Sequence, residues 1–375
     1  MRYEHVCIES LAHELPPHVV TSDDIEQQLA PVYERLGLPF GRLELMTGIR
    51  ERRIWPVGTR PSGPSITTAN QMLDKIGFDR RHIGCLIHAS VCRDFLEPAT
   101  ASVVHDGLGL SSACWTFDIS NACLGLLNGL TQIAALIESG AIKAGIVVGT
   151  ENSRSLLEQT VKYLNGNSEL TRQTIKTALA SLTIGSASCA MLLVHESLSE
   201  SGAAILTSVA RCHSLHNDLC RSDHDSAGTA MQPLMDTDAE QLLHAGIAAG
   251  MDTFGPFLTE SQWSTEDLDA TICHQVGGRH RAAMLESLGL SMERDTATFP
   301  WMGNTGSVAL PTALAAAAAW GRVQSMHRVG LLGIGSGINC VMVGSEWSHV
   351  SITGNLPESD PTVVAPSLAA SVERV

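Results

Sequence analysis

The sequence lacks an excess of positive charge. Its 375 residues include 24 Lys and Arg against 39 Asp and Glu, which gives a formal net charge of −15. Binding to a polyanion requires clustered Lys and Arg that displace condensed counterions, so this balance argues against a nucleic-acid partner. One short basic run, with Arg50, Arg52 and Arg53, is a candidate contact for smaller ligands that carry phosphate.

Long apolar segments are also missing. No stretch of about 18 uncharged apolar residues occurs, so no membrane-spanning helix is expected. The first residues, Met1 to His5, have neither the charged lead nor the apolar run of a secretory signal peptide. Together these absences predict a cytoplasmic protein without a membrane span.

The cysteines lack the spacing of a disulfide framework. Such frameworks belong to small secreted chains, whereas the ten cysteines here are scattered singly through apolar segments of a long chain. This pattern favours a reducing compartment. Cys212, His213, His216 and Cys220 lie close together in sequence, but their spacing fits no standard structural zinc site, so no metal is expected.

Apolar residues are plentiful enough for a large core, since 44% of the chain is hydrophobic and 17% is charged. Short β-branched runs alternate with stretches rich in Ala, Leu and Gly, which predicts an α/β fold built of layers. Two helices with little charge are predicted to be buried on all sides, at 124–138 and 308–320. The predicted buried strands are 83–89, 145–149, 187–194, 329–334 and 339–343.

A weak internal repeat indicates two similar halves. The tripeptide Ile-Gly-Ser occurs at 184–186 and again at 334–336, each time ahead of an apolar strand. Further upstream, Cys123 and Asn304 each precede a buried helix that leads to an apolar strand. The two residues are therefore expected at equivalent positions of the two halves.

The predicted domain organisation has three parts. Residues 1–200 form an N-terminal half and residues 201–350 form a C-terminal half. The more polar residues 200–240 are expected to form loops or a cap between the halves. Residues 351–375 are rich in Ser, Pro and Ala without periodicity, so a disordered tail is expected there.

Cys123 is the candidate nucleophile. It follows a strand-like run and stands at the start of an apolar helix, where the helix N-terminus is expected to lower the pKa of the thiol. Its small neighbours Ala122 and Gly125 would leave room for a substrate. The alternative is a buried structural cysteine, which is the usual role of a cysteine in such a run.

A nucleophilic cysteine needs a histidine and a polar orienting group nearby in space. His274 follows the strand-like run 270–273 and precedes Gly277 and Gly278, so its side chain should project at a strand end. Asn304 lies in a glycine turn before a helix. A core histidine and a capping asparagine are the alternatives, but the order Cys, His, Asn, each at an element boundary, favours a catalytic set.

These residues lie in motifs that resemble the ketoacyl synthase III branch of the thiolase superfamily. The resemblance covers roughly residues 1–348 and is strongest to the OleA type, the acyl-CoA:acyl-CoA condensing enzymes that begin long-chain olefin and β-lactone biosynthesis. The matching motifs are Thr47-Gly-Ile-Arg-Glu-Arg-Arg53, Ser90-Val-Cys-Arg-Asp-Phe-Leu-Glu-Pro98, Phe117 to Leu124, His274-Gln-Val276, Gly303-Asn-Thr-Gly306 and Gly333-Ile-Gly-Ser-Gly337.

The resemblance implies a thiolase fold, which is a duplicated five-layered αβαβα core. It implies a non-decarboxylative Claisen condensation of two fatty acyl-CoAs to a 2-alkyl-3-ketoacyl product through an acyl-cysteine. Cys123, His274 and Asn304 would form the catalytic set. Coenzyme A thioesters would be the substrates, and no other cofactor is expected.

The resemblance also implies that Glu97 is the catalytic base. Joining two plain acyl-CoAs requires the removal of an α-proton, which a decarboxylating synthase avoids by losing carbon dioxide. Glu97 would reach the neighbouring subunit's site across a dimer interface, and burial among acyl chains would strengthen it as a base. The alternative is a solvated glutamate in a loop.

Further roles are expected for the glycine turn and the arginines. The run 333–337 lacks the full spacing of a dinucleotide loop, so Gly335 and Gly337 are expected to pack against Cys123 and to lend a backbone N–H to the oxyanion. Arg50, Arg52 and Arg53 would contact the phosphates of coenzyme A. The apolar residues Met231, Met235, Leu242 and Leu243 fit core packing better than an acyl channel.

Two other functions stay open from the sequence. The first is a decarboxylating 3-oxoacyl-ACP synthase III that uses a malonyl substrate. The second is one subunit of a heterodimer that donates residues to a related partner, as occurs in some β-lactone pathways of the lipstatin type. The partner would then be a related subunit in place of a second copy.

Overall fold

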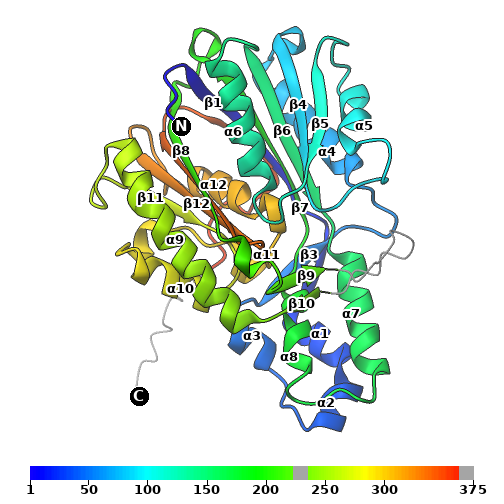
Figure 1. The fold of residues 1–375 in the computed structure, drawn as a ribbon. Coiled ribbons are helices and arrows are strands. Elements are labelled where there is room, and N and C mark those ends of the chain that lie inside the picture. Colours follow the sequence, from blue (N-terminus) through cyan, green and yellow to red (C-terminus); the bar gives the residue numbers. More distant parts are fainter. Residues whose placement is uncertain (223–234, 363–375) are drawn as a thin grey trace, which may run out of the picture.

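The computed structural model describes residues 1–222 and 235–362 (Figure 1). A mixed sheet of ten strands runs through the molecule in the order β11-β12-β13-β8-β1-β7-β6-β4-β5, with β14 paired to β1. Its strands are β1 Val6–Glu14, β4 Ile83–Ala89, β5 Trp115–Ile119, β6 Ala144–Glu151, β7 Ala187–His195, β8 Ala203–Cys212, β11 Ala270–Cys273, β12 Arg328–Gly335, β13 Asn339–Glu346 and β14 Ser351–Gly354.

The strand order repeats itself, which confirms the predicted duplication. Strand β1 pairs antiparallel with β7, β7 antiparallel with β6, and β4 lies parallel to both β6 and β5. In the second half β8, β13, β12 and β11 follow the same series of directions. The place of β5 is taken there by a single parallel bridge between Thr271 and Asp295.

The two halves are covered by helices in layers. Helices α6 (Gly125–Glu138) and α12 (Ala309–Ala319) pack between the strands of the two halves and belong to one continuous apolar core. Helices α4 (Ser62–Ile76) and α5 (Thr100–Gly107) cover the outer face of the first half. Helices α9 (Ala239–Ser261) and α10 (Gly278–Ser287) lie outside the second half (Figure 1). The succession is the five-layered thiolase arrangement that the resemblance implied.

A separate group of short elements extends from one end of the sheets (Figure 1). Its helices bury their own apolar cluster, which includes Ile25, Tyr33 and Leu164. The elements of this end are β2 His18–Thr21, α1 Ser22–Gln28, α2 Ala30–Leu36, α3 Arg42–Thr47, β3 Glu51–Ile54, α7 Arg154–Gly166, α8 Ile175–Ala178, β9 Cys220–Ser222 and β10 Met235–Thr237.

The predicted core elements are confirmed, with bounds that differ by a few residues. The five predicted strands are β4, β6, β7, β12 and β13, and the two predicted buried helices are α6 and α12. Their continuous apolar runs result from burial on both faces of the sheet, because helices pack on each side. In the described part of the chain, no helix has the length and apolarity needed to cross a membrane.

Two predictions about irregular segments were wrong. The polar stretch 200–240 contains β8, which pairs with β1 and β13 in the interior of the sheet, and it also contains the start of α9. Residues 223–234 of this stretch lie outside the described residues. The predicted tail from 351 begins with β14, which pairs parallel to β1. Asn355 then bonds both backbone groups of Leu15. Residues 363–375 of that prediction lie outside the described residues.

Candidate active site

Cys123 lies in the tight connection between β5 and α6. Its neighbour Ala122 has φ of 45°, a left-handed conformation that is uncommon for any residue other than glycine. Backbone conformations of this kind cost free energy and concentrate at functional sites. The thiol is half-buried at the start of the central helix layer.

The pKa of the Cys123 thiol differs from the prediction. Burial raises it to about 12, and the neighbouring Glu151 carboxylate contributes to the rise. The sequence had suggested a lowered pKa because of the helix N-terminus. Desolvation outweighs that effect here, so Cys123 is a protonated thiol at rest.

The C-terminal end of β12 lies against the Cys123 loop. A Cβ atom on Gly335 would be 3.5 Å from the backbone nitrogen of Cys123 and 3.1 Å from the Leu124 side chain. Asn339, across the turn, donates from Nδ2 to Oδ1 of Asn121 at 3.1 Å. The turn from Gly335 to Asn339 is therefore fastened to the loop of the nucleophile, as expected for Gly335. Gly337, with φ of 126°, packs against Asn339.

His274 lies at the same end of the sheet. It follows β11, and its backbone N–H donates to the carbonyl of Leu332 in β12 at 3.2 Å, three residues before Gly335. Burial, with a smaller contribution from His280, lowers the pKa of His274 to about 4. The imidazole is therefore neutral at physiological pH and has one N–H to donate.

Asn304 is held from the other side of the site. Its backbone N–H donates to Thr183 at 2.9 Å, and its carbonyl accepts from Gly185 at 2.9 Å. Its side-chain oxygen accepts the N–H of Gly306 at 3.0 Å, and within the described residues its side-chain nitrogen donates to no protein group. The residue is nearly buried, so this nitrogen is a fixed donor.

Glu151 links the Asn304 turn to the nucleophile and was missed from the sequence. Its Oε1 accepts the hydroxyl of Ser307 at 2.5 Å, the N–H of Ser307 at 3.2 Å and the N–H of Val91 at 3.3 Å. The side chain is 3% exposed, and its charge acts on Cys123. A glutamate at the end of the apolar run 145–149 was the available signal.

Glu97 is exposed in the single chain. Its loop is fastened to the edge strand β5, because the Asp118 carboxylate accepts the N–H groups of Thr100 and Ala101 at 2.8 and 2.7 Å. The N–H of Ser90 donates to Ile119 at 3.2 Å at the other end of the loop. The chain therefore does not bring Glu97 into its own buried site.

The three arginines lie in different environments. Arg52 is fully buried, where it donates to Leu182, Val20 and Ser22, so the prediction that it contacts a phosphate was wrong. It cross-links the segment at the end of the sheets instead. Arg53 is partly buried, and Arg50 is exposed.

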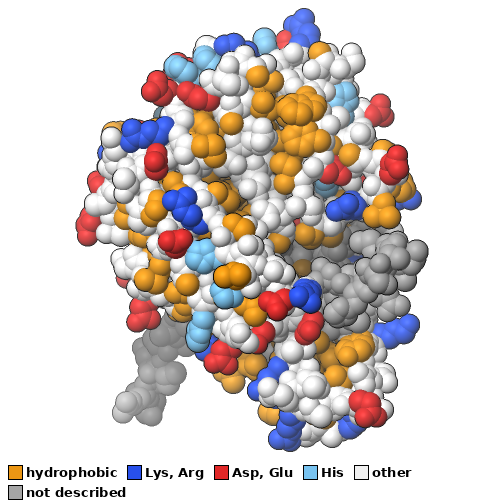
Figure 2. Space-filling view, in the orientation of Figure 1, with side chains coloured by type: hydrophobic (Ala, Val, Ile, Leu, Met, Phe, Trp, Pro, Cys, Tyr) orange, Lys and Arg blue, Asp and Glu red, His pale blue; other side chains and the backbone are white. Residues whose placement is uncertain are grey.

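Two further expectations concern a metal site and an acyl channel. Among residues 1–222 and 235–362, no group of three or more His, Cys, Asp and Glu side chains is placed to hold a metal ion. Leu243 is a buried core residue, and Leu242 packs against the apolar cluster that includes Ala245 and Ala249, as predicted. Met231 lies outside the described residues. On the face in Figure 2, Lys and Arg are interspersed with Asp and Glu, without a continuous basic surface among the described residues.

A duplicated α/β core with a cysteine ahead of one central helix and an asparagine ahead of the other defines the thiolase class of fold. Family models describe the same class. The 3-oxoacyl-[acyl-carrier-protein (ACP)] synthase III model matches residues 117–214, and the model of its C-terminal part matches residues 258–347.

Individual proteins with higher similarity to this chain indicate the family within that class. The chain is 39% identical over 358 residues to an acyl-CoA:acyl-CoA alkyltransferase of Shewanella oneidensis, covering 92% of this chain and all of that protein. An enzyme of the same name from Xanthomonas campestris is 35% identical, with 92% and 100% coverage. The chain belongs to the acyl-CoA:acyl-CoA alkyltransferase (OleA) family.

Solved structures agree with this assignment. A cysteine-to-alanine variant of Xanthomonas campestris OleA superposes with a TM-score of 0.87 at 34% identity, covering 92% of this chain and 98% of the other. A cysteine-to-serine variant of that protein, solved with bound lauric acid and lauroyl-CoA, has a TM-score of 0.86 at 34% identity, with 92% and 100% coverage.

Proposed function

We propose that this protein joins two fatty acyl-CoAs in a Claisen condensation without decarboxylation. The observation that carries the proposal is the end-to-end similarity to proteins named acyl-CoA:acyl-CoA alkyltransferase. The position of Cys123 beside the β12 turn supports it, because a nucleophile and backbone donors meet there. The proposed product is a 2-alkyl-3-ketoacyl-CoA, which water would hydrolyse to a β-keto acid and coenzyme A.

The first half-reaction loads Cys123. Its sulfur attacks the carbonyl carbon of an acyl-CoA, the bond from that carbon to the CoA sulfur breaks, and free coenzyme A leaves with the thiol proton. The N–H of Cys123 and one from the Gly335–Gly337 turn would stabilise the oxyanion of the intermediate. Because the pKa of Cys123 is about 12, the thiol must lose its proton as the attack proceeds.

The second half-reaction forms the carbon–carbon bond. Neutral His274 and the side-chain amide nitrogen of Asn304 would donate to the thioester oxygen of a second acyl-CoA. Glu97 takes its α-proton, the resulting carbanion bonds to the acyl carbon, and the bond to Cys123 breaks. The thiolate then recovers a proton, which returns Glu97 to its carboxylate.

A dimer would bring Glu97 to a site. Strand β5 is the last strand of the sheet, and its Trp115 is 57% exposed. Val91 and Leu96 in the attached Glu97 loop are also exposed. An uncovered sheet edge flanked by apolar side chains is suited to pairing with another chain. We take a second copy as the partner, and a related subunit as the alternative.

Substrate placement and compartment complete the proposal. Arg50 and Arg53 remain candidates for the phosphates of coenzyme A, since Arg50 is exposed and its backbone bonds Pro300 close to the Asn304 turn. All ten cysteines are free thiols, which suits a reducing compartment such as the cytoplasm.

The first test is incubation of the purified protein with one long-chain acyl-CoA and no malonyl substrate. Mass spectrometry should detect acylated Cys123 together with the β-keto acid or the ketone formed by its decarboxylation. Acylation without product would indicate a malonyl-type second substrate or a missing partner subunit. Absence of acylation would exclude Cys123 as a nucleophile that acts in this chain alone.

The base is tested by Glu97→Gln. Condensation should fall by about 10²- to 10⁴-fold, the usual contribution of a positioned base, while acyl-Cys123 still forms and accumulates. Glu286→Gln, at an exposed glutamate in α10, is the matched control and should behave as the wild type. Loss of acylation in Glu97→Gln would contradict the assigned role.

A further inference from the structure

The inference concerns how the backbone on either side of His274 is held. In the first half of the fold, β5 covers the outer edge of β4. Among residues 1–222 and 235–362, strand β11 has only the bridge from Thr271 to Asp295 at the corresponding edge. The N–H of Cys273, one residue before His274, therefore needs an acceptor that a strand does not supply.

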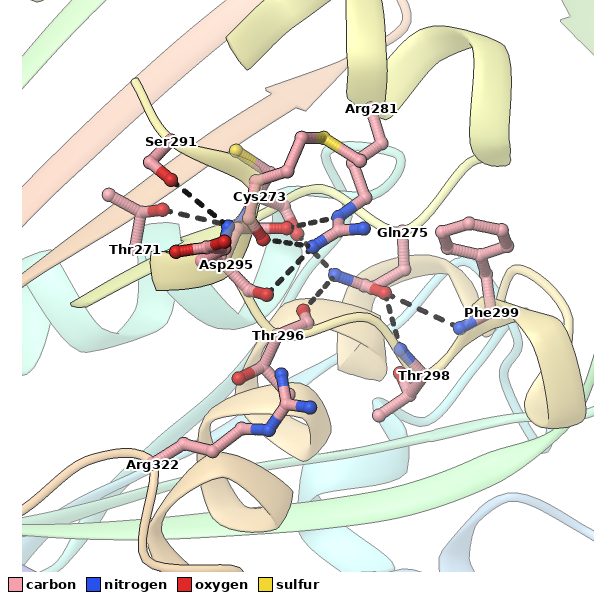
Figure 3. A network of polar contacts seen from close by, with 12 residues as sticks. Thr271, Cys273, Gln275, Arg281, Ser291, Asp295, Thr296, Thr298, Phe299 and Arg322 are labelled. Atoms are coloured by element: carbon pink, nitrogen blue, oxygen red, sulfur yellow. Dashed lines mark hydrogen bonds and ion pairs between the residues drawn. The ribbon is translucent and has the colours of Figure 1, made fainter. Parts of the chain in front are cut away.

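The Asp295 side chain supplies that acceptor (Figure 3). Its Oδ1 accepts the N–H of Cys273 at 2.9 Å and lies 3.4 Å from the hydroxyl of Thr271. The residue is completely buried. Burial raises the pKa of Asp295, and the Arg281 guanidinium opposes that rise. The carboxylate thus accepts the backbone N–H that a neighbouring strand at this edge of β11 would otherwise bond.

Arg281 holds the carboxylate in place. Its Nε donates to Oδ2 of Asp295 at 2.5 Å, and its Nη2 donates to the backbone carbonyls of Asp295 and Met292 at 2.7 and 2.9 Å. The Arg281 side chain is 15% exposed. One guanidinium therefore fixes both the side chain and the backbone of Asp295. The ammonium group of a lysine, which acts as a point charge, would not form this forked set of bonds.

Gln275 fastens the other side of His274 (Figure 3). Its Nε2 donates to the carbonyls of Cys273 and Thr296 at 2.7 and 3.1 Å. Its Oε1 accepts the N–H of Thr298 at 2.8 Å. The side chain is 1% exposed, so these bonds do not compete with water.

We propose that Asp295, Arg281 and Gln275 are positioning residues that hold His274 at the angle needed to donate to the second acyl-CoA. None of the three need touch substrate. The proposal rests on the proposed function for its kinetic test, because His274 is assigned to the condensation step. A displacement of about 1 Å at a reacting group can cost a factor near 10² in rate.

The main variant is Asp295→Asn. It keeps the side-chain volume and one oxygen, but it places an N–H₂ group against the donors of Arg281. We expect the condensation kcat to fall by about 10- to 100-fold, with the KM for acyl-CoA and the yield of acyl-Cys123 changed by less than about threefold. A purely structural role would instead lower the apparent kcat and the yield of acyl-Cys123 by the same factor through loss of folded protein, with KM unchanged.

Companion variants keep the test decisive if Asp295→Asn does not fold. Gln275→Met leaves the ion pair intact and should show the same selective loss of kcat. Arg281→Lys keeps the positive charge but loses the forked bonding, so its kcat should lie between that of the wild type and Asp295→Asn. Arg322→Met breaks the neighbouring pair with Asp360, which does not bond residues 273–275, and should leave kcat unchanged.

Amide hydrogen exchange provides a readout that does not depend on the reaction. Asp295→Asn and Gln275→Met should exchange faster than wild type in peptides that cover 272–276, and Arg322→Met should not. Wild-type protein that forms no product would refute the proposed function while this measurement still decides the positioning. Unchanged exchange at 272–276, or equal losses in acylation and condensation, would overturn the inference.

Discussion

At the scale of single residues, Cys123 and His274 are both neutral groups in the substrate-free protein. Burial raises the pKa of the thiol to about 12 and lowers the pKa of the imidazole to about 4. A thiol–imidazole pair with these values does not exist as thiolate and imidazolium at rest. A neutral imidazole keeps one N–H, which can donate to a carbonyl in the condensation step.

The reactivity of Cys123 should therefore depend steeply on pH. Only the thiolate is alkylated, so the rate constant for iodoacetamide at Cys123 in the substrate-free protein should rise about tenfold per pH unit from about pH 7 to 9.5. Mass spectrometry of the peptide that contains Cys123 gives this rate. A plateau near neutral pH would mean that an ion pair forms at rest and would contradict the raised pKa.

Glu151→Gln is the companion measurement at this scale. The glutamine oxygen can still accept from Ser307, but the negative charge that raises the pKa of Cys123 is removed. Alkylation of Cys123 should therefore be faster than in wild type throughout the same pH range.

At the scale of elements, β14 extends the sheet beside β1, and the residues after it bind to neighbouring segments. Asn355 accepts the N–H of Leu15 at 2.8 Å and donates to its carbonyl at 3.0 Å. Further along, Pro357 accepts from the Trp320 indole at 2.9 Å, and Asp360 pairs with Arg322 at 2.9 Å. This segment is fixed by specific polar bonds, whereas its apolar content is low.

Asn355→Ala should be destabilising for that reason. It removes the hydrogen-bond partners of the N–H and carbonyl of Leu15, and each lost bond costs about 0.5–1.5 kcal/mol. Urea or thermal unfolding measures the loss. Glu358→Ala, at an exposed position of the same segment, is the control and should unfold like the wild type. Equal stability of both variants would show that the contacts after β14 contribute nothing.

At the scale of the whole molecule, the duplicated fold divides the proposed catalytic groups between its halves. Cys123 comes from the first half, and His274 and Asn304 come from the second, so the proposed catalytic set needs both halves. Glu97 lies in the exposed loop attached to the edge strand of the first half. The base is therefore the one proposed group that requires a second subunit.

Subunit mixing tests this requirement. Cys123→Ala and Glu97→Gln should each be inactive in condensation. A mixed dimer contains one site with an intact Cys123 and an intact Glu97 donated by the partner, so mixing after subunit exchange should restore roughly half of wild-type activity per mixed dimer. Product formation from the two acyl-CoAs measures the recovery. No recovery in a verified mixed dimer would mean that Glu97 acts within its own chain or not at all.

Local sequence patterns determined much of this protein. Continuous apolar runs set β4, β6, β7, β12 and β13, because strands covered on both faces need no polar alternation. Glycine and small residues at element ends marked the loops of Cys123, His274 and Asn304. The order of those motifs was specific enough to indicate the family, since it does not depend on knowing which loops meet.

Only the tertiary structure decided the burial, the hydrogen bonds and the pKa shifts of the residues in those motifs. Three features depend on residues that are far apart in the chain. They are the burial of Arg52, the placement of Glu151 beside Cys123, and the hydrogen bond from the N–H of Cys273 to Asp295. Their roles depend on desolvation and on which backbone groups lack partners, and neither quantity is periodic along the chain. For the same reason the direction of the Cys123 pKa shift became apparent only after packing.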